Sequence, residues 1–112
     1  MVERTYYKNG NISSERYLKN NKLHREDDPV LIRYYQNGNI YEEKYYENGN
    51  ILCEMYLING MAHRLNGAAR AEYFENWEID QQYYFIDDIE YEEFEYYVKV
   101  GILNGSKKNS LL

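Results

Sequence analysis

The chain has 112 residues and a formal net charge of −6 at pH 7, with 15 tyrosines, one proline and one cysteine. This length suits a single domain, and the acidic balance opposes non-specific binding to nucleic acid or to an anionic bilayer, because both need a basic surface. A lone Cys53 excludes an intramolecular disulfide, and no N-terminal run resembles a signal peptide, so we expect a cytoplasmic protein.

Turn-forming pairs recur along the chain at two intervals, of 11 and 17 residues. Asn-Gly between alternating apolar residues is the strongest short-range signal for a two-residue hairpin turn, because both central positions need a positive φ. The sequence therefore predicts an all-β, elongated, single-layer antiparallel meander. The predicted turns are Asn9-Gly10, Asn20-Asn21, Asn37-Gly38, Asn48-Gly49, Asn59-Gly60, Asn76-Trp77, Asp87-Asp88 and Asn104-Gly105.

An aromatic residue and an isoleucine flank each turn of the shorter units. If Asn37-Gly38 forms the tip of a two-residue turn, Tyr35 lies opposite Ile40, and the same arithmetic pairs Tyr46 with Ile51. Such cross-strand pairs are the unit of sheet stabilisation. We expect these residues to form the core along one side of the ribbon: Tyr7, Ile12, Tyr35, Ile40, Tyr46, Ile51, Phe74 and Ile79.

The longer units carry six extra residues, which hold a second turn at Asp27-Asp28-Pro29 and at Asn66-Gly67. In the third copy, residues 89–100 predict a strand in preference to a short capping helix, because of their aromatic and β-branched content. The polar run 106–110 is expected to fray. Residues 1–100 are thus predicted to form the repeat domain, and residues 101–112 a degenerate cap and flexible tail.

His24-Arg25 and His63-Arg64 occupy equivalent places in two units. A zinc site would need further donors, so a structural role is preferred. In that role, a ring nitrogen bonds a backbone group at the turn, and each arginine pairs with a nearby carboxylate. We expect no metal and no cofactor.

The carboxylate pairs and the cysteine do not predict an enzyme. Glu42 and Glu43 are neighbours on a predicted strand and point to opposite faces, so they cannot converge on one bond. Cys53 has no histidine in sequence reach and no helix N-terminus to activate it. The tyrosine rows could stack single-stranded nucleic acid, but such sites also need a positive groove. We therefore expect no catalytic residues and no nucleic-acid partner.

Two segments resemble the MORN repeat, in the variant form found in phage, bacterial and large-DNA-virus proteins. They are residues 45–51 (Tyr-Tyr-Glu-Asn-Gly-Asn-Ile), followed by Tyr56-Leu57-Ile58-Asn59-Gly60 and His63-Arg64, and the run Lys22 to Val30. The resemblance covers roughly residues 5 to 91. Asp28, Val30 and Ala68 depart from the pattern. The resemblance implies a fold of stacked hairpins with an aromatic-lined groove. Members of the family mostly act as scaffolds, linkers or dimerisation modules, and phospholipid binding has been proposed for several.

These observations lead to one functional hypothesis and one alternative. The hypothesis is a non-enzymatic scaffold for protein contact, including homodimerisation, through the aromatic groove and the terminal sheet edges, in the host-cell cytoplasm or in a virion. The alternative is a peripheral phospholipid-binding module, which would need cations gathered on one face. The cations are instead spread along the chain, at Lys8, Arg16, Arg33, Lys44, Arg64 and Arg70.

Overall fold

The structure, a computed structural model, describes residues 1–47 and 49–110, with side chains described as far as Leu103. The predicted turn residue Asn48 and the last two residues of the predicted tail lie outside this range. The elements are β1 (Val2–Tyr6), β2 (Ile12–Lys19), β3 (Lys22–Leu23), β4 (Leu31–Tyr34), β5 (Ile40–Glu47), β6 (Asn50–Ile58), β7 (Met61–Ala62), β8 (Arg70–Tyr73), β9 (Ile79–Ile86), β10 (Ile89–Tyr91) and α1 (Glu93–Ser110).

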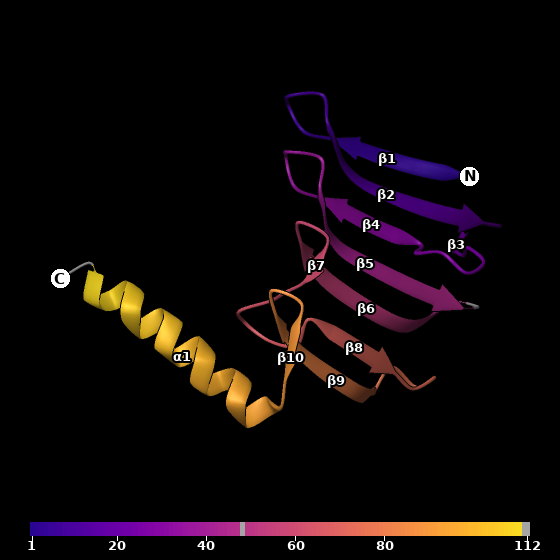
Figure 1. The fold of residues 1–112 in the computed structure, drawn as a ribbon. Coiled ribbons are helices and arrows are strands. Elements are labelled where there is room, and N and C mark those ends of the chain that lie inside the picture. The colour runs from indigo at the N-terminus through magenta and orange to yellow at the C-terminus, as the bar shows by residue number, and fades with distance from the viewer. Residues whose placement is uncertain (48, 111–112) are drawn as a thin grey trace.

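The strands form one open antiparallel sheet, in the order β1-β2-β4-β5-β6-β8-β9-β10 (Figure 1). The short strands β3 and β7 pair only with β2 and β6, at the ends of those longer strands. The molecule measures 53 × 38 × 19 Å, so it is thin in one direction. The predicted all-β, single-layer antiparallel meander is confirmed.

The segment from β2 to β5 is repeated as the segment from β6 to β9, 39 residues further along the chain. Glu15 of the first unit, for example, corresponds to Glu54 of the second. Within each unit the chain leaves the sheet between the short strand and the next long one. We call residues 24–29 the first lobe and residues 63–68 the second lobe. Each unit contributes three long strands to the sheet, β2, β4 and β5 in the first and β6, β8 and β9 in the second.

Equivalent side chains of the two units lie on opposite faces of the sheet. Glu15 pairs with Ile32, and Ile32 pairs with Glu43, so these three share one face, which we call face A. Glu54 pairs with Lys44, the neighbour of Glu43 along β5, and therefore lies on the other face, face B. The expectation that the core residues line a single side of the ribbon is wrong.

The change of face follows from the number of strands in a unit. Three is odd, so the second unit runs opposite to the first in strand direction while the chain progresses across the sheet in the same sense. Both units consist of L-amino acids, so only a rotation can carry one onto the other. The rotation that relates the two units reverses the direction of the strands and keeps the sense in which they follow one another across the sheet. Such a rotation also exchanges the two faces of the sheet.

The hairpins of the shorter units close with three-residue loops in three of four cases. In the first, the Tyr7 amide donates to the Asn11 carbonyl over 2.8 Å, and the Gly10 amide donates to the Tyr7 carbonyl over 3.0 Å. Gly10 has a φ of 89°, so the loop is a type I turn followed by a left-handed residue. Gly38 and Trp77 take the same position in the β4–β5 and β8–β9 hairpins.

These longer loops shift the predicted pairing by one residue. The isoleucines at 12, 40 and 79 lie opposite Tyr6, Tyr34 and Tyr73, and not opposite Tyr7, Tyr35 and Phe74. Two-residue turns with positive φ at both positions do form at Asn20-Asn21, Asn59-Gly60 and Asp87-Asp88, as predicted. In the β5–β6 hairpin Tyr46 lies opposite Ile51, also as predicted, and Gly49 has a φ of 82°.

Burial differs from the predicted core as well. Of the eight expected residues only Ile51 is buried, while Phe74 and Ile79 are 51% and 50% exposed and Tyr35 is also exposed. Phe74 and Ile79 belong to the β8–β9 hairpin, which is the last of the hairpins of the shorter units. The buried apolar residues are Val30, Ile32, Ile51, Ala62, Ala68, Ala69, Ala71, Tyr84, Tyr96 and Val100.

The strand predicted for residues 89–100 is wrong beyond Tyr91, because α1 begins at Glu93. Tyr96 and Val100, four residues apart, bury against the second lobe and Tyr84, and this tertiary packing outweighs their strand propensity. The helix also contains the predicted turn at 104–105 and the run 106–110, and it crosses the predicted domain boundary at residue 100. No helix within the described ranges is long and apolar enough to cross a membrane.

Candidate interaction surface

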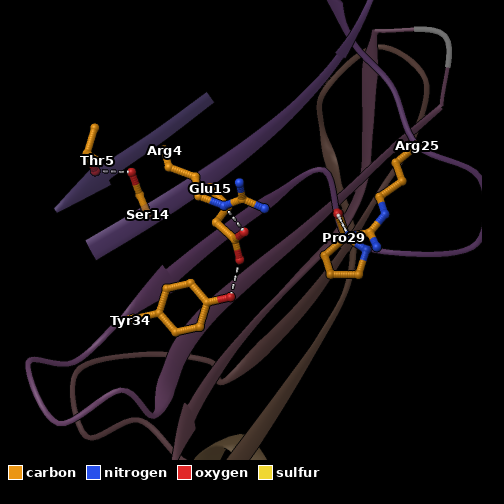
Figure 2. A network of polar contacts seen from close by, with 7 residues as sticks. All are labelled: Arg4, Thr5, Ser14, Glu15, Arg25, Pro29 and Tyr34. Atoms are coloured by element: carbon orange, nitrogen blue, oxygen red, sulfur yellow. Dashed lines mark hydrogen bonds and ion pairs between the residues drawn. The ribbon is translucent and has the colours of Figure 1, made fainter. Parts of the chain in front are cut away.

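Glu15 is the centre of a polar network on face A (Figure 2). It is one of two buried carboxylates in the described chain; its Oε2 accepts a hydrogen bond from Arg4 Nε over 2.7 Å, and its Oε1 accepts one from the Tyr34 hydroxyl. Burial raises the pKa of Glu15, but the hydrogen bonds from Tyr34 and Arg4 outweigh burial, so the pKa lies below its usual range. Burial and the Glu15 carboxylate raise the pKa of Tyr34.

The second unit repeats this arrangement on face B. Tyr73 donates its hydroxyl proton to Glu54 Oε1 over 2.6 Å, and Lys44 lies 3.8 Å from Glu54 Oε2. Burial and the hydrogen bond to Glu54 raise the pKa of Tyr73. The tyrosine–glutamate pair is therefore a structural feature of the unit, and it lies on face A in the first unit and on face B in the second.

The two lobes are held by arginines that stack on tyrosines. The guanidinium of Arg25 lies 3.9 Å from the ring centre of Tyr17, and that of Arg64 lies 4.0 Å from the ring centre of Tyr56. Arg64 also donates to the Ala68 carbonyl over 3.2 Å. These contacts hold the first lobe against β2 and the second lobe against β6. Both guanidinium groups are thus engaged by contacts within the chain.

The histidines sit at the base of the lobes. His63 Nδ1 accepts a hydrogen bond from the Asp87 amide over 3.0 Å, which ties the second lobe to the β9–β10 turn. Arg25 lies 3.6 Å from Asp28, whereas Arg64 contacts Asn66 over 2.9 Å and pairs with no carboxylate among the described side chains. The predicted arginine–carboxylate pair therefore forms at Arg25 and not at Arg64.

Residues that could carry chemistry do not converge in the described chain. No group of three or more histidine, cysteine, aspartate or glutamate side chains is placed to hold a metal ion there. Burial raises the pKa of the Cys53 thiol, so the thiolate is disfavoured. Glu42, the second buried carboxylate, lies 3.1 Å from Arg33.

The helix presents a row of exposed apolar side chains. Phe94, Val98 and Ile102 are 82%, 47% and 59% exposed, and their spacing of four residues places them along one side of α1. On another side, Tyr96 is fully buried; its hydroxyl lies 2.5 Å from the Arg64 carbonyl and accepts a hydrogen bond from the Gly67 amide over 3.2 Å. Figure 1 shows that α1 projects away from the sheet beyond β10.

A groove of about 830 Å³ runs along the outer edge of β9. Its lining consists of residues 79–84 on one side and 90–93, at the end of β10 and the start of α1, on the other. The groove is open to solvent and mostly polar. It is larger than the hollow of about 410 Å³ beside the first lobe.

Sequence reasoning did not find the residues that define these surfaces. Tyr34 and Tyr73 are not among the predicted core residues, yet each bonds a glutamate 19 positions before it. The signal was present in the recurrence of that spacing. Tyr96 had no such signal, because it occurs in one copy only.

Comparison with models of known protein families, with curated protein sequences and with solved structures finds no significant match to this chain.

Proposed function

We propose that this chain is a non-enzymatic scaffold for protein–protein contact, and that one of its partners is a second copy of itself. The observation that carries the proposal is the apolar side of α1, formed by Phe94, Val98 and Ile102. Most of the stability of a helix in a protein comes from the packing of its apolar face. Tyr96 and Val100 anchor one side of the helix, and the exposed side formed by Phe94, Val98 and Ile102 is open to a partner surface.

The sequence of α1 favours a second copy as that partner. It is acidic at its start, with Glu93 and Glu95, and has no acidic residue after them, while Lys107 and Lys108 lie near its end. Two such helices packed antiparallel would bring the acidic start of each beside the basic end of the other. An interface of this kind is self-complementary, as two-fold dimers require.

The hydrogen bonds and ion pairs within the chain support a non-enzymatic role and give no support to the alternative of phospholipid binding. The carboxylates of the two units are held by tyrosine hydroxyls and cations. Of the eleven lysines and arginines whose side chains are described, six lie in ion pairs within the chain: Arg4 with Glu15, Arg16 with Glu3, Arg25 with Asp28, Arg33 with Glu42, Lys44 with Glu54 and Arg70 with Glu72. The relation to MORN repeats stays a proposal, supported by hairpins joined in one thin sheet.

Sedimentation velocity of the whole chain, from about 1 μM to about 100 μM, tests the proposal. We expect the wild type to form dimers as concentration rises, and a variant carrying Phe94→Ser, Val98→Ser and Ile102→Ser to remain monomeric. Leu52→Ser is the matched control, since Leu52 is an exposed apolar residue on the sheet. Circular dichroism establishes that each variant is folded. A monomeric wild type throughout, or a triple variant that dimerises equally well, would overturn the proposal.

A further inference from the structure

The last long strand of the sheet is paired along only part of its outer edge. β10 pairs with Tyr84, Phe85 and Ile86, so residues 79–83 of β9 have a neighbour on the β8 side alone. In the first unit the equivalent strand, β5, is covered along Glu42 to Glu47 by β6. The edge of β9 is therefore the position of a strand that none of the described residues supplies.

The missing strand has an identifiable cause. If the β9–β10 ladder continued, Glu93 would lie opposite Gln82, but the chain enters α1 at Glu93. The first turn of the helix thus diverges from the sheet where a further ladder would begin. The groove of about 830 Å³ lies between β9 and this diverging segment.

Backbone groups of β9 point into the groove. The carbonyls of Tyr83 and Phe85 accept hydrogen bonds from the amides of Ala69 and Arg64, over 3.0 and 3.2 Å, and so face the β8 side. In an antiparallel strand the N–H and C=O of one residue point the same way and alternate along the chain. The N–H and C=O of Gln82 consequently face the open edge.

The groove is acidic. Asp80, Glu90, Glu92 and Glu93 line it, and no lysine or arginine does. Within the part of the chain that the structure describes, none of these four carboxylates has an ion-pair partner. A bound segment that carries positive charge would relieve their mutual repulsion.

We propose that the edge of β9 binds an extended, lysine- or arginine-rich segment of another protein, which adds to the sheet as an antiparallel strand. This inference rests on the proposed contact function and names the partner class for a second surface, which meets the apolar side of α1 at Glu93. A second copy fits this edge poorly. The β9 edge of a second copy would place the same carboxylates against those of the groove. The β1 edge of a second copy carries Arg4 beside Glu3 and so has no excess of positive charge.

The binding test uses the whole chain and a fluorescent peptide of alternating lysine and valine, measured by anisotropy. We expect saturable binding of this peptide and none of a glutamate–valine peptide. Gln82→Pro removes the amide that faces the groove without removing a bond to β8, and we expect about tenfold weaker binding, the equivalent of one lost hydrogen bond. Gln82→Ala is the matched control and retains wild-type affinity, because the bond is to the backbone.

A second arm requires no change in the protein. A peptide with the same charges and alternate N-methylated amides cannot pair as a strand, and we expect it to bind about tenfold more weakly. Equal binding of the methylated peptide, or of the polyamine spermine, would show attraction by charge alone and overturn strand addition. The double change Glu90→Lys and Glu92→Lys should abolish binding of the lysine peptide, whereas Glu26→Lys, an exposed site on the first lobe, should not.

The two proposals fail separately. Gln82→Pro should leave the self-association of α1 intact, and the triple serine variant of α1 should still bind the lysine peptide. If the wild type instead forms open chains that Gln82→Pro abolishes, a second copy fills the β9 edge and the basic-segment inference is overturned.

Discussion

Glu15 and Glu54 hold the same position in two copies of one unit, yet their carboxylates lie on opposite faces of the same sheet. Each is bonded by the tyrosine 19 residues further along, Tyr34 or Tyr73. The local chemistry of the unit is thus preserved while its orientation in the molecule is reversed.

The tyrosine–glutamate bonds should contribute to stability in both halves. Tyr73→Phe removes one hydrogen bond to a charged acceptor, and we expect the free energy of unfolding to fall by about 2 kcal/mol, with a similar loss for Tyr34→Phe. Urea denaturation measures both. Tyr6→Phe is the control, because Tyr6 is largely exposed and should change stability little. Equal effects at all three sites would contradict the assignment.

The carboxylate of Glu15 should make the fold sensitive to acid. Its pKa in the folded chain lies below the ordinary value of 4.5, because the bonds from Tyr34 and Arg4 outweigh burial. The ionised group therefore stabilises the fold above that pH, and its contribution is lost as the pH falls through the folded-state pKa. The stability difference between wild type and Glu15→Gln should shrink on acidification below 4.5. Urea denaturation at several acidic pH values measures this difference.

Two tyrosines should govern stability in alkali. Burial, together with the charges of Glu43 and Glu42 respectively, raises the pKa of Tyr45 and of Tyr56 to about 12 from the ordinary 10. A raised folded-state pKa means that the contribution is complete below pH 10 and is lost as the pH rises through about 12. A variant with both tyrosines changed to phenylalanine should lose less stability across this interval. Denaturant titrations at several alkaline pH values would show it.

Tyr96 should hold α1 on the sheet. Tyr96→Ala removes a fully buried ring together with the hydroxyl that contacts the Arg64 carbonyl, and we expect a loss of about 3 kcal/mol. Protease cleavage near the start of α1 should accelerate in this variant. Phe94→Ala, at low concentration, should leave cleavage unchanged, because Phe94 contacts little within the chain. Fast cleavage in both variants would indicate that the anchor lies elsewhere.

Trp77 should be strained at its turn position. Its φ is 71°, where the two equivalent loops carry glycine. Trp77→Gly and Trp77→Ala both remove the ring that meets Tyr46 at 6.2 Å, so their difference isolates the backbone. We expect the glycine variant to be more stable than the alanine variant by about 1 kcal/mol. Thermal unfolding of the pair measures the difference.

The fold class could be predicted because turn chemistry acts over a few residues. Asn59-Gly60 and Asp87-Asp88 form the turns that their positive φ angles require. The pairing of Tyr34 with Ile40 could not, since Asn37-Gly38 serves equally in a two-residue turn and in a three-residue loop, and the choice moves the register by one. The helix was missed because its formation depends on the burial of Tyr96 against a lobe 29 residues earlier at Gly67.

The odd strand count has a consequence for longer relatives of this architecture. Appending another unit of 39 residues would return its lobe to the side of the first, so that alternate units, and never adjacent ones, present the same chemistry in one direction. A ligand that binds two identical lobes from one side of the sheet would need to span the unit between them. Arrays with even and odd numbers of units would therefore differ in valency toward a flat partner, although every unit is the same.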